Sequence, residues 1–144
     1  MQLSLTHILL AGLVATVLMT LFSYALSYAV ERNFKEPEIL GILLKRLAPH
    51  LNTLVYYLFG WVLHFAVGYL FVTAYSLLWE NTAIKPTLLN GVWIGFVSVL
   101  AGIGIWHVTL KLHPNPPFLN LPAYYANLLV AHVIFGVGAA LAYQ

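Results

Sequence analysis

The stretch YYLFGWVLHFAVGYLFVTAY, from Tyr56 to Tyr75, contains no acidic residue, no lysine and no arginine, and it holds His64 near its middle. A helix of about 20 apolar residues is long enough to cross the ~30 Å hydrocarbon core of a bilayer. The stretch therefore predicts a membrane-spanning helix with an ionisable imidazole inside it.

The rest of the chain has the same character. Its 144 residues are 62% hydrophobic and 7% charged, with a mean hydropathy of +0.89, whereas soluble domains carry roughly 25% charged residues. The chain contains no cysteine, which excludes disulfides and thiolate metal ligands. We predict an all-α integral membrane protein, a bundle of four transmembrane helices forming a single domain over residues 1–144, with spans at about 3–30, 54–79, 86–110 and 121–143.

Helix-start signals agree with these limits. Asn52 or Thr53 can cap the second span, Pro86 suits the first turn of the third, and Asn120 with Pro122 opens the fourth. The first apolar run lacks a basic leader and a cleavage site, so we expect it to be a retained helix rather than a signal peptide.

The loop after the first span contains a short amphipathic pattern. Ile39, Ile42, Leu43 and Leu47 recur at helical spacing. This spacing predicts a short interfacial helix, with a plain polar loop as the alternative.

Basic residues are unevenly divided between the loops, and the formal net charge is only +2. They gather in the first and third loops, and the second loop holds Lys85 alone; the basic residues of the first and third loops are Arg32, Lys35, Lys45, Arg46 and Lys111. Such charge reports orientation and not nucleic-acid binding. We expect a multi-pass protein of a cell inner membrane, with loops 31–53 and 111–120 cytoplasmic and both termini outside.

An internal repeat is visible when the opening stretch is laid over Tyr124–Tyr143. Seven positions match, including paired tyrosines and the two histidines, at 56/124, 57/125, 62/130, 64/132, 68/136, 74/142 and 75/143. Two spans per copy would preserve topology, so the match predicts two similar helical hairpins related by an axis along the membrane normal.

The repeated histidines are the main functional candidates. At 1.5 Å per residue, His64 and His132 lie roughly 15 to 16 Å into their spans, near the bilayer midplane. Ionisable groups at this depth are costly and mark functional sites by default, although an imidazole can also be a plain polar contact between helices. Positions seven before and four after each histidine share its face, which adds Tyr57, Gly68, Tyr125 and Gly136 to the candidate binding residues.

Haem b is the specific cofactor that this pattern favours. A divalent ion held by two neutral imidazoles would keep an uncompensated charge in a low-dielectric medium, whereas the porphyrin dianion cancels that of ferrous iron. His64 and His132 would be the axial metal ligands, beside space left by Gly68 and Gly136. Cu⁺ held linearly by the two histidines is the weaker variant, and redox, sensing or quinone exchange would be the function.

A second histidine cluster is expected near the predicted cytoplasmic loops. His50, His107 and His113 could meet a carboxylate there, from Glu31, Glu36 or Glu38. No pair has the spacing of a known metal motif. Whether these residues form a second site is left open.

Two short segments carry a resemblance. ATVLMT at 15–20 and HVIFG at 132–136 resemble segments of small uncharacterised bacterial four-span inner-membrane proteins of the YagU-like kind. The resemblance implies a bacterial membrane setting and no particular activity.

Other functional classes fit the same composition. The chain could be a non-catalytic accessory or scaffold subunit, or a small transporter or channel in which the histidines line a path. Small residues along the first and third spans predict a homo-oligomer or a larger membrane complex. The sequence does not decide whether the protein is an enzyme.

Overall fold

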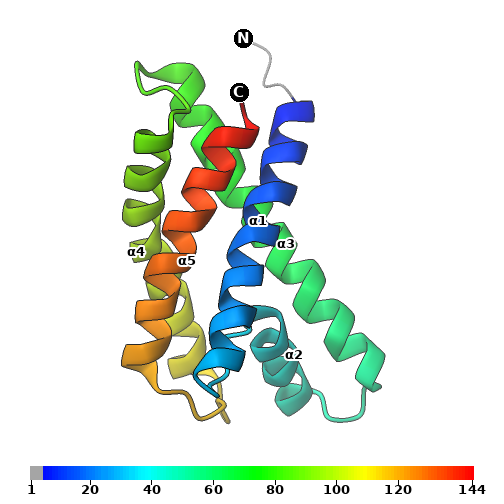
Figure 1. Cartoon of the computed structure of the whole chain (residues 1–144). Coiled ribbons are helices and arrows are strands. Elements are labelled where there is room, and N and C mark those ends of the chain that lie inside the picture. The colour runs from blue at the N-terminus through cyan, green and yellow to red at the C-terminus, as the bar shows by residue number, and fades with distance from the viewer. Residues whose placement is uncertain (1–4) are drawn as a thin grey trace.

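The computed structural model describes residues 5–144, and these form five helices connected by short loops (Figure 1). Four are long and apolar enough to cross a membrane: α1 (Leu5–Ala29), α3 (Thr53–Asn81), α4 (Leu88–Leu112) and α5 (Leu121–Ala142). The predicted all-α, four-span membrane fold is confirmed. Each span boundary lies within two residues of the predicted one, except the expected start at residue 3, which lies outside the described residues.

The caps explain where the spans begin. The side chain of Asn52 accepts a hydrogen bond from the Val55 amide, and that of Asn120 accepts one from the Ala123 amide. The prediction for Pro86 was wrong: α4 is capped by Thr87 and starts at Leu88. The hydroxyl of Thr87 accepts a hydrogen bond from a backbone amide that would otherwise lack a partner, so α4 begins one residue after Thr87.

The predicted short helix after the first span is α2 (Glu36–Leu47). It lies at the end of the bundle opposite the start of α1 and the end of α5, beside the lower part of α3 (Figure 1). Its first turns are buried and its last turn is exposed, with Leu47 58% accessible although the pattern placed it on the apolar face. The helix therefore enters the bundle with its N-terminal end.

Small residues bring α2 and α3 together. A Cβ on Gly60 would collide with the carbonyl of Pro37, and one on Gly41 would lie 2.8 Å from the carbonyl oxygen of Tyr56. Close backbone approach of this kind is how helices associate in lipid, where burial of apolar surface gives little driving force. The glycines thereby fix the first turn of α2 against the bundle.

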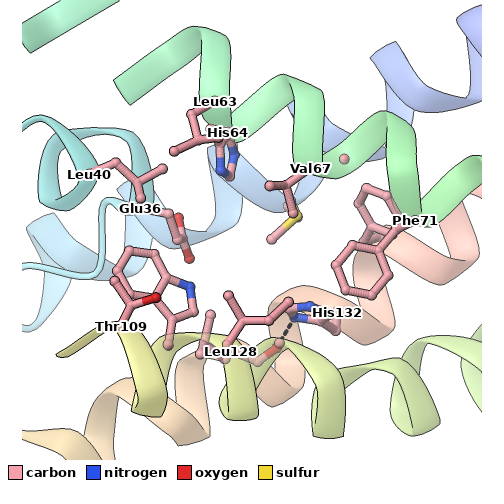
Figure 2. A pocket seen from close by; sticks show the side chains of 15 residues that line it. Glu36, Leu40, Leu63, His64, Val67, Phe71, Thr109, Leu128 and His132 are labelled. Atoms are coloured by element: carbon pink, nitrogen blue, oxygen red, sulfur yellow. Dashed lines mark hydrogen bonds between the residues drawn. The ribbon is translucent and has the colours of Figure 1, made fainter. Parts of the chain in front are cut away.

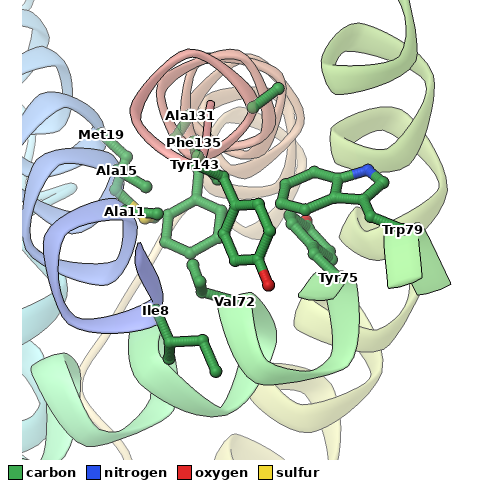
Figure 3. Close-up of a cluster of buried hydrophobic side chains, with 12 residues drawn as sticks. Ile8, Ala11, Ala15, Met19, Val72, Tyr75, Trp79, Ala131, Phe135 and Tyr143 are labelled. Atoms are coloured by element: carbon green, nitrogen blue, oxygen red, sulfur yellow. The ribbon is translucent and has the colours of Figure 1, made fainter. Parts of the chain in front are cut away.

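The main core lies where α1, α3 and α5 meet (Figure 3), and its residues reach from Ile8 near the start of α1 to Tyr143 after the end of α5. Small side chains of α1 and α5 face larger rings, and the cluster includes Ile8, Ala11, Ala15, Met19, Val72, Tyr75, Trp79, Ala131, Phe135 and Tyr143. A second cluster joins α2, α4 and α5 and includes Ile39, Leu43, Val99, Tyr124 and Leu128. Between the two clusters the bundle is open.

That opening follows from an asymmetry in the packing. Helix α5 packs along both α4 and α1, and α3 packs along α1 and α2. If the α1–α3 and α4–α5 hairpins were related by a twofold axis, the contact of α1 with α5 would be matched by a contact of α3 with α4. Instead, α3 diverges from α4 toward the α2 end (Figure 1). The packing thus does not follow the predicted repeat, which stays a prediction from the sequence.

Candidate functional site

A cavity of about 250 Å³ occupies the space between the diverging parts of α3 and α4 (Figure 2). All five helices contribute to its wall, which is almost entirely apolar. Its polar side chains are His64, His132, Glu36, Thr109 and Trp106; the other lining residues are Met19, Leu40, Leu63, Val67, Gly68, Phe71, Gly102, Ile105, Leu128 and Phe135. The two predicted histidines therefore line one cavity.

His64 enters from α3 and is 8% exposed. Its Nε2 lies 2.8 Å from the hydroxyl oxygen of Thr20 on α1. That hydroxyl donates its only proton to the carbonyl of Thr16, at 2.6 Å. Thr20 must therefore accept from His64, so the neutral imidazole carries its proton on Nε2 and keeps an acceptor lone pair on Nδ1.

His132 enters from α5 and is 6% exposed. Its Nδ1 donates to the carbonyl oxygen of Leu128, at 2.9 Å. Its opposite edge lies against α4, because a Cβ on Gly102 would be 2.6 Å from Nε2. Phe71 of α3 meets the ring edge-on, with centroids 5.6 Å apart. A carbonyl can only accept, so Nε2 of the neutral ring is again a lone-pair acceptor.

Glu36 is a functional candidate whose position in the cavity wall could not be predicted from the sequence. It is the first residue of α2, only 2% exposed, and its carboxylate reaches the cavity wall (Figure 2). Oε1 accepts from the hydroxyl of Ser23 at 2.9 Å and from the amide of Asn127 at 3.3 Å. Oε2 is buried and has no hydrogen-bond partner among residues 5–144.

The environment of Glu36 changes its protonation. Burial raises the pKa of its carboxyl to about 7, and the hydrogen bonds from its own backbone, from Ser23 and from Asn127 offset only part of that rise. The carboxyl is thus poised to exchange a proton near neutral pH. Helical spacing gave a signal for its burial, since Glu36 shares a face with Ile39 and Leu43.

The predicted tyrosines do not belong to the cavity. Tyr57 is 58% exposed, and Tyr125 is half-buried and outside the lining. The buried members of each pair are Tyr56 and Tyr124, eight residues before the histidines. The buried residues of α3 and α5 recur about every four positions. The tyrosine eight residues before each histidine therefore lies on the buried face, and the tyrosine seven residues before it does not.

The two predicted glycines also have packing roles. Gly68 lines the cavity, but a Cβ there would collide with the hydroxyl of Thr16 on α1. Gly136 lies against the backbone of Gly91 and Gly95 on α4, and so leaves no space beside His132. The prediction of a flat space next to each histidine was therefore wrong for Gly136, and both glycines bring helices together.

The second histidine cluster does not form a metal site. His107 contacts the hydroxyl of Tyr125, with Nδ1 3.2 Å away, and His113 contacts the carbonyl of Leu43 at 3.0 Å. His50 is exposed. Over residues 5–144, no three histidines or carboxylates gather where they could hold a metal ion.

Haem b fits this geometry only in part. His132 has the arrangement typical of a metal ligand, with one ring nitrogen donating to a carbonyl and a lone pair on the other. His64 offers Nδ1, because its Nε2 is engaged by Thr20, and Nε2 of His132 lies against Gly102. An axial pair must approach one iron from opposite sides, so both rings would have to turn and the cavity to widen. Haem binding stays a prediction.

The sequence matches no model of a known protein family, no curated protein and no solved structure, so its function has to be inferred from the cavity itself.

Proposed function

We propose that the protein binds a lipid-soluble ring compound carrying hydroxyl groups, of which an isoprenoid quinol is the chemical type, in the cavity between α3 and α4. The observation that carries this proposal is the state of the two histidines. Each uses its N–H within the protein, to Thr20 and to Leu128, and each keeps an acceptor nitrogen. Two acceptor nitrogens in a mostly apolar cavity favour a ligand with two donors, one of which would reach Nε2 of His132 beside Gly102 in the cavity wall.

The size and lining of the cavity support the same class of ligand. A volume of about 250 Å³ is below the roughly 300 to 1,000 Å³ of pockets that enclose a whole drug-sized molecule. It suits one ring, with an attached apolar chain left outside. Because α3 and α4 do not pack along each other and the lining residue Ile105 is 54% exposed, that chain could leave between them into lipid.

A binding titration tests the proposal. Trp106 lines the cavity, so tryptophan fluorescence of the protein in lipid nanodiscs should be quenched saturably by a short-chain quinol. The oxidised quinone has acceptors in place of donors and should bind more weakly. With a net value of about 0.5 to 1.5 kcal/mol per hydrogen bond, we expect a loss of about 2- to 12-fold for each unmade bond.

Matched variants make this test specific. His64→Leu and His132→Leu should each weaken quinol binding by a similar factor and reduce the preference for quinol over quinone. His107→Leu, in the same membrane but outside the cavity, should bind as the wild type does. Equal binding of quinol and quinone, unaffected by either cavity variant, would refute the proposal.

A visible spectrum distinguishes haem binding from the proposed quinol binding. Protein expressed with ample haem and purified in mild detergent should show sharp low-spin bands on reduction if His64 and His132 are both axial ligands. Colourless protein that still binds quinol would exclude haem and retain the proposed ligand class.

Orientation and assembly are further parts of the proposal. The basic residues at the α2 end, among them Lys45, Arg46 and Lys111, support a cytoplasmic position for that end in an inner membrane.

Large exposed side chains on α4, such as Trp93 and Leu100, are available to lipid or to a second copy. The sequence leads us to expect a homo-oligomer or a larger complex. If the mass of the protein in lipid nanodiscs were that of one chain over a wide concentration range, this expectation would be contradicted.

A further inference from the structure

Glu36 is a buried carboxylate that forms no ion pair with a basic side chain of residues 5–144. In the described part of the chain, the ion pair at this end of the bundle joins Lys35 to the neighbouring Glu38, at 3.3 Å. The Lys35 ammonium also lies over the rings of Tyr24 and Tyr28, 5.5 and 4.7 Å from their centroids. The basic side chain next to Glu36 is therefore held on the outside. An isolated charge in such a place is costly unless a proton or a cation neutralises it.

The polar groups around Glu36 belong to Ser23 and Asn127, and several oxygens of this cluster have no hydrogen-bond partner among residues 5–144. Glu36 Oε2 and Asn127 Oδ1 are both buried without a hydrogen-bond partner between residues 5 and 144. Their side chains are in contact, since Asn127 Nδ2 lies 3.3 Å from Glu36 Oε1. Ser23 touches both, at 2.9 Å from Glu36 Oε1 and 3.2 Å from Asn127 Nδ2. The hydroxyl of Tyr124, one turn before Asn127, also lacks a partner there.

These oxygens come from α1, α2 and α5, so the cluster exists only in the folded bundle. Carboxylate, amide and hydroxyl oxygens are the ligands that hard cations prefer. One carboxylate balances one positive charge, whereas a divalent ion would leave a net charge in an apolar surrounding. We propose that Glu36, Asn127 and Ser23 form a binding site for a monovalent alkali cation, in which the Asn127 amide turns so that Oδ1 replaces Nδ2 on the side of Glu36 and water completes the coordination.

Such a site must exchange its cation for a proton. The cation requires the ionised carboxylate, so its binding to the protonated form of Glu36 releases one proton. The other titratable groups that face the cavity are His64 from α3 and His132 from α5, and Tyr124 lies beside Asn127; from α4 the cavity receives Trp106 and Thr109. None of these brings a fixed positive charge.

Two measurements on the full chain in mild detergent test the site. The first is the melting temperature at pH 6 and pH 8 in NaCl, in KCl and in choline chloride at equal ionic strength. We expect NaCl or KCl to raise the melting temperature relative to choline chloride, more at pH 8 than at pH 6, because protons compete at the lower pH. The second is proton release into weakly buffered solution at pH 7 when NaCl or KCl is added, with up to one proton expected per chain.

The variants locate the effect. Glu36→Gln should abolish both the salt-specific shift and the proton release, and Asn127→Leu should weaken them. Glu38→Gln removes a carboxylate two residues away on the same helix and should leave both unchanged. Neither readout needs a ligand in the cavity, so the outcome is independent of the quinol proposal.

Proton release by the wild type can be measured even if Glu36→Gln fails to fold. Equal melting temperatures in the three salts together with no proton release would overturn the proposal and make Glu36 a proton site alone. An effect that survives in Glu36→Gln would overturn it as well.

Discussion

At the scale of single residues, Glu36 sets the pH dependence of stability. Its carboxyl has a pKa of about 7 in the folded chain, against an ordinary 4.5. Between these values the folded protein keeps a proton that the unfolded chain has released, so stability falls as the pH rises. The stabilisation is complete below about pH 4.5 and is lost through pH 7, with a slope of at most about 1.4 kcal/mol per pH unit.

Chemical denaturation in choline chloride buffers from pH 4.5 to 8 measures this slope. Because other groups of the chain contribute to the total slope, the informative quantity is the difference between the wild type and Glu36→Gln. We expect the variant to lose the part of the slope assigned to Glu36 and to exceed the wild type in stability above pH 7. A difference that does not vary with pH would show that Glu36 stays ionised when folded.

Only some of these residues could be predicted from the sequence. Hydropathy and the internal match identified His64 and His132, because an imidazole in an apolar span stands out in composition alone. The hydrogen-bond partners Thr20 and Leu128 could not be derived, since they depend on how α1 and α5 are rotated. The place of Glu36 in the cavity wall could not be derived either, since it requires α2 to insert its N-terminal end into the bundle.

At the scale of elements, the contact between α4 and α5 holds one wall of the cavity. Gly95 permits that contact: a Cβ there would collide with the carbonyl oxygen of His132 and lie 2.9 Å from the Cα of Val133. Backbone atoms cannot move aside as a flexible side chain can. The helices must separate if the position carries a side chain.

Gly95→Leu should therefore destabilise the protein by about 1 to 3 kcal/mol, the usual cost of overpacking, or more. Gly104→Leu is the matched control, since Gly104 is on the same helix and a Cβ there would meet nothing within 4 Å. Thermal unfolding in detergent, followed by circular dichroism, measures both. Equal effects of the two substitutions would mean that α4 and α5 do not approach at Gly95.

The elements were predictable to different degrees. The four spans followed from apolar length, and the caps at Asn52 and Asn120 from residue type. The divergence of α3 from α4 did not follow, because the repeat favoured a symmetric bundle. The structure breaks that symmetry where α2, which has no counterpart in the second hairpin, packs against α3.

At the scale of the whole molecule, the start of α1, the end of α5 and loop 82–87 lie at one end, and α2 with loop 113–120 lies at the other (Figure 1). Positions 45 and 85 should therefore be on opposite sides of the membrane. The chain has no cysteine, so Lys45→Cys and Lys85→Cys each carry a single thiol for a membrane-impermeant reagent. In intact cells we expect labelling of the Cys at position 85 and protection of the one at 45; equal labelling would contradict the four-span arrangement.

The central claim is that a lipid-soluble quinol binds between α3 and α4 at the two histidines. Photo-crosslinking with a diazirine-bearing quinol, followed by peptide mapping, tests it most directly in native membranes. We expect crosslinks within 63–71 of α3 and 102–109 of α4, which excess unlabelled quinol should remove and which His64→Leu and His132→Leu should reduce. Crosslinks confined to outward-facing residues such as Leu100 and Leu129, or insensitive to competition, would contradict it.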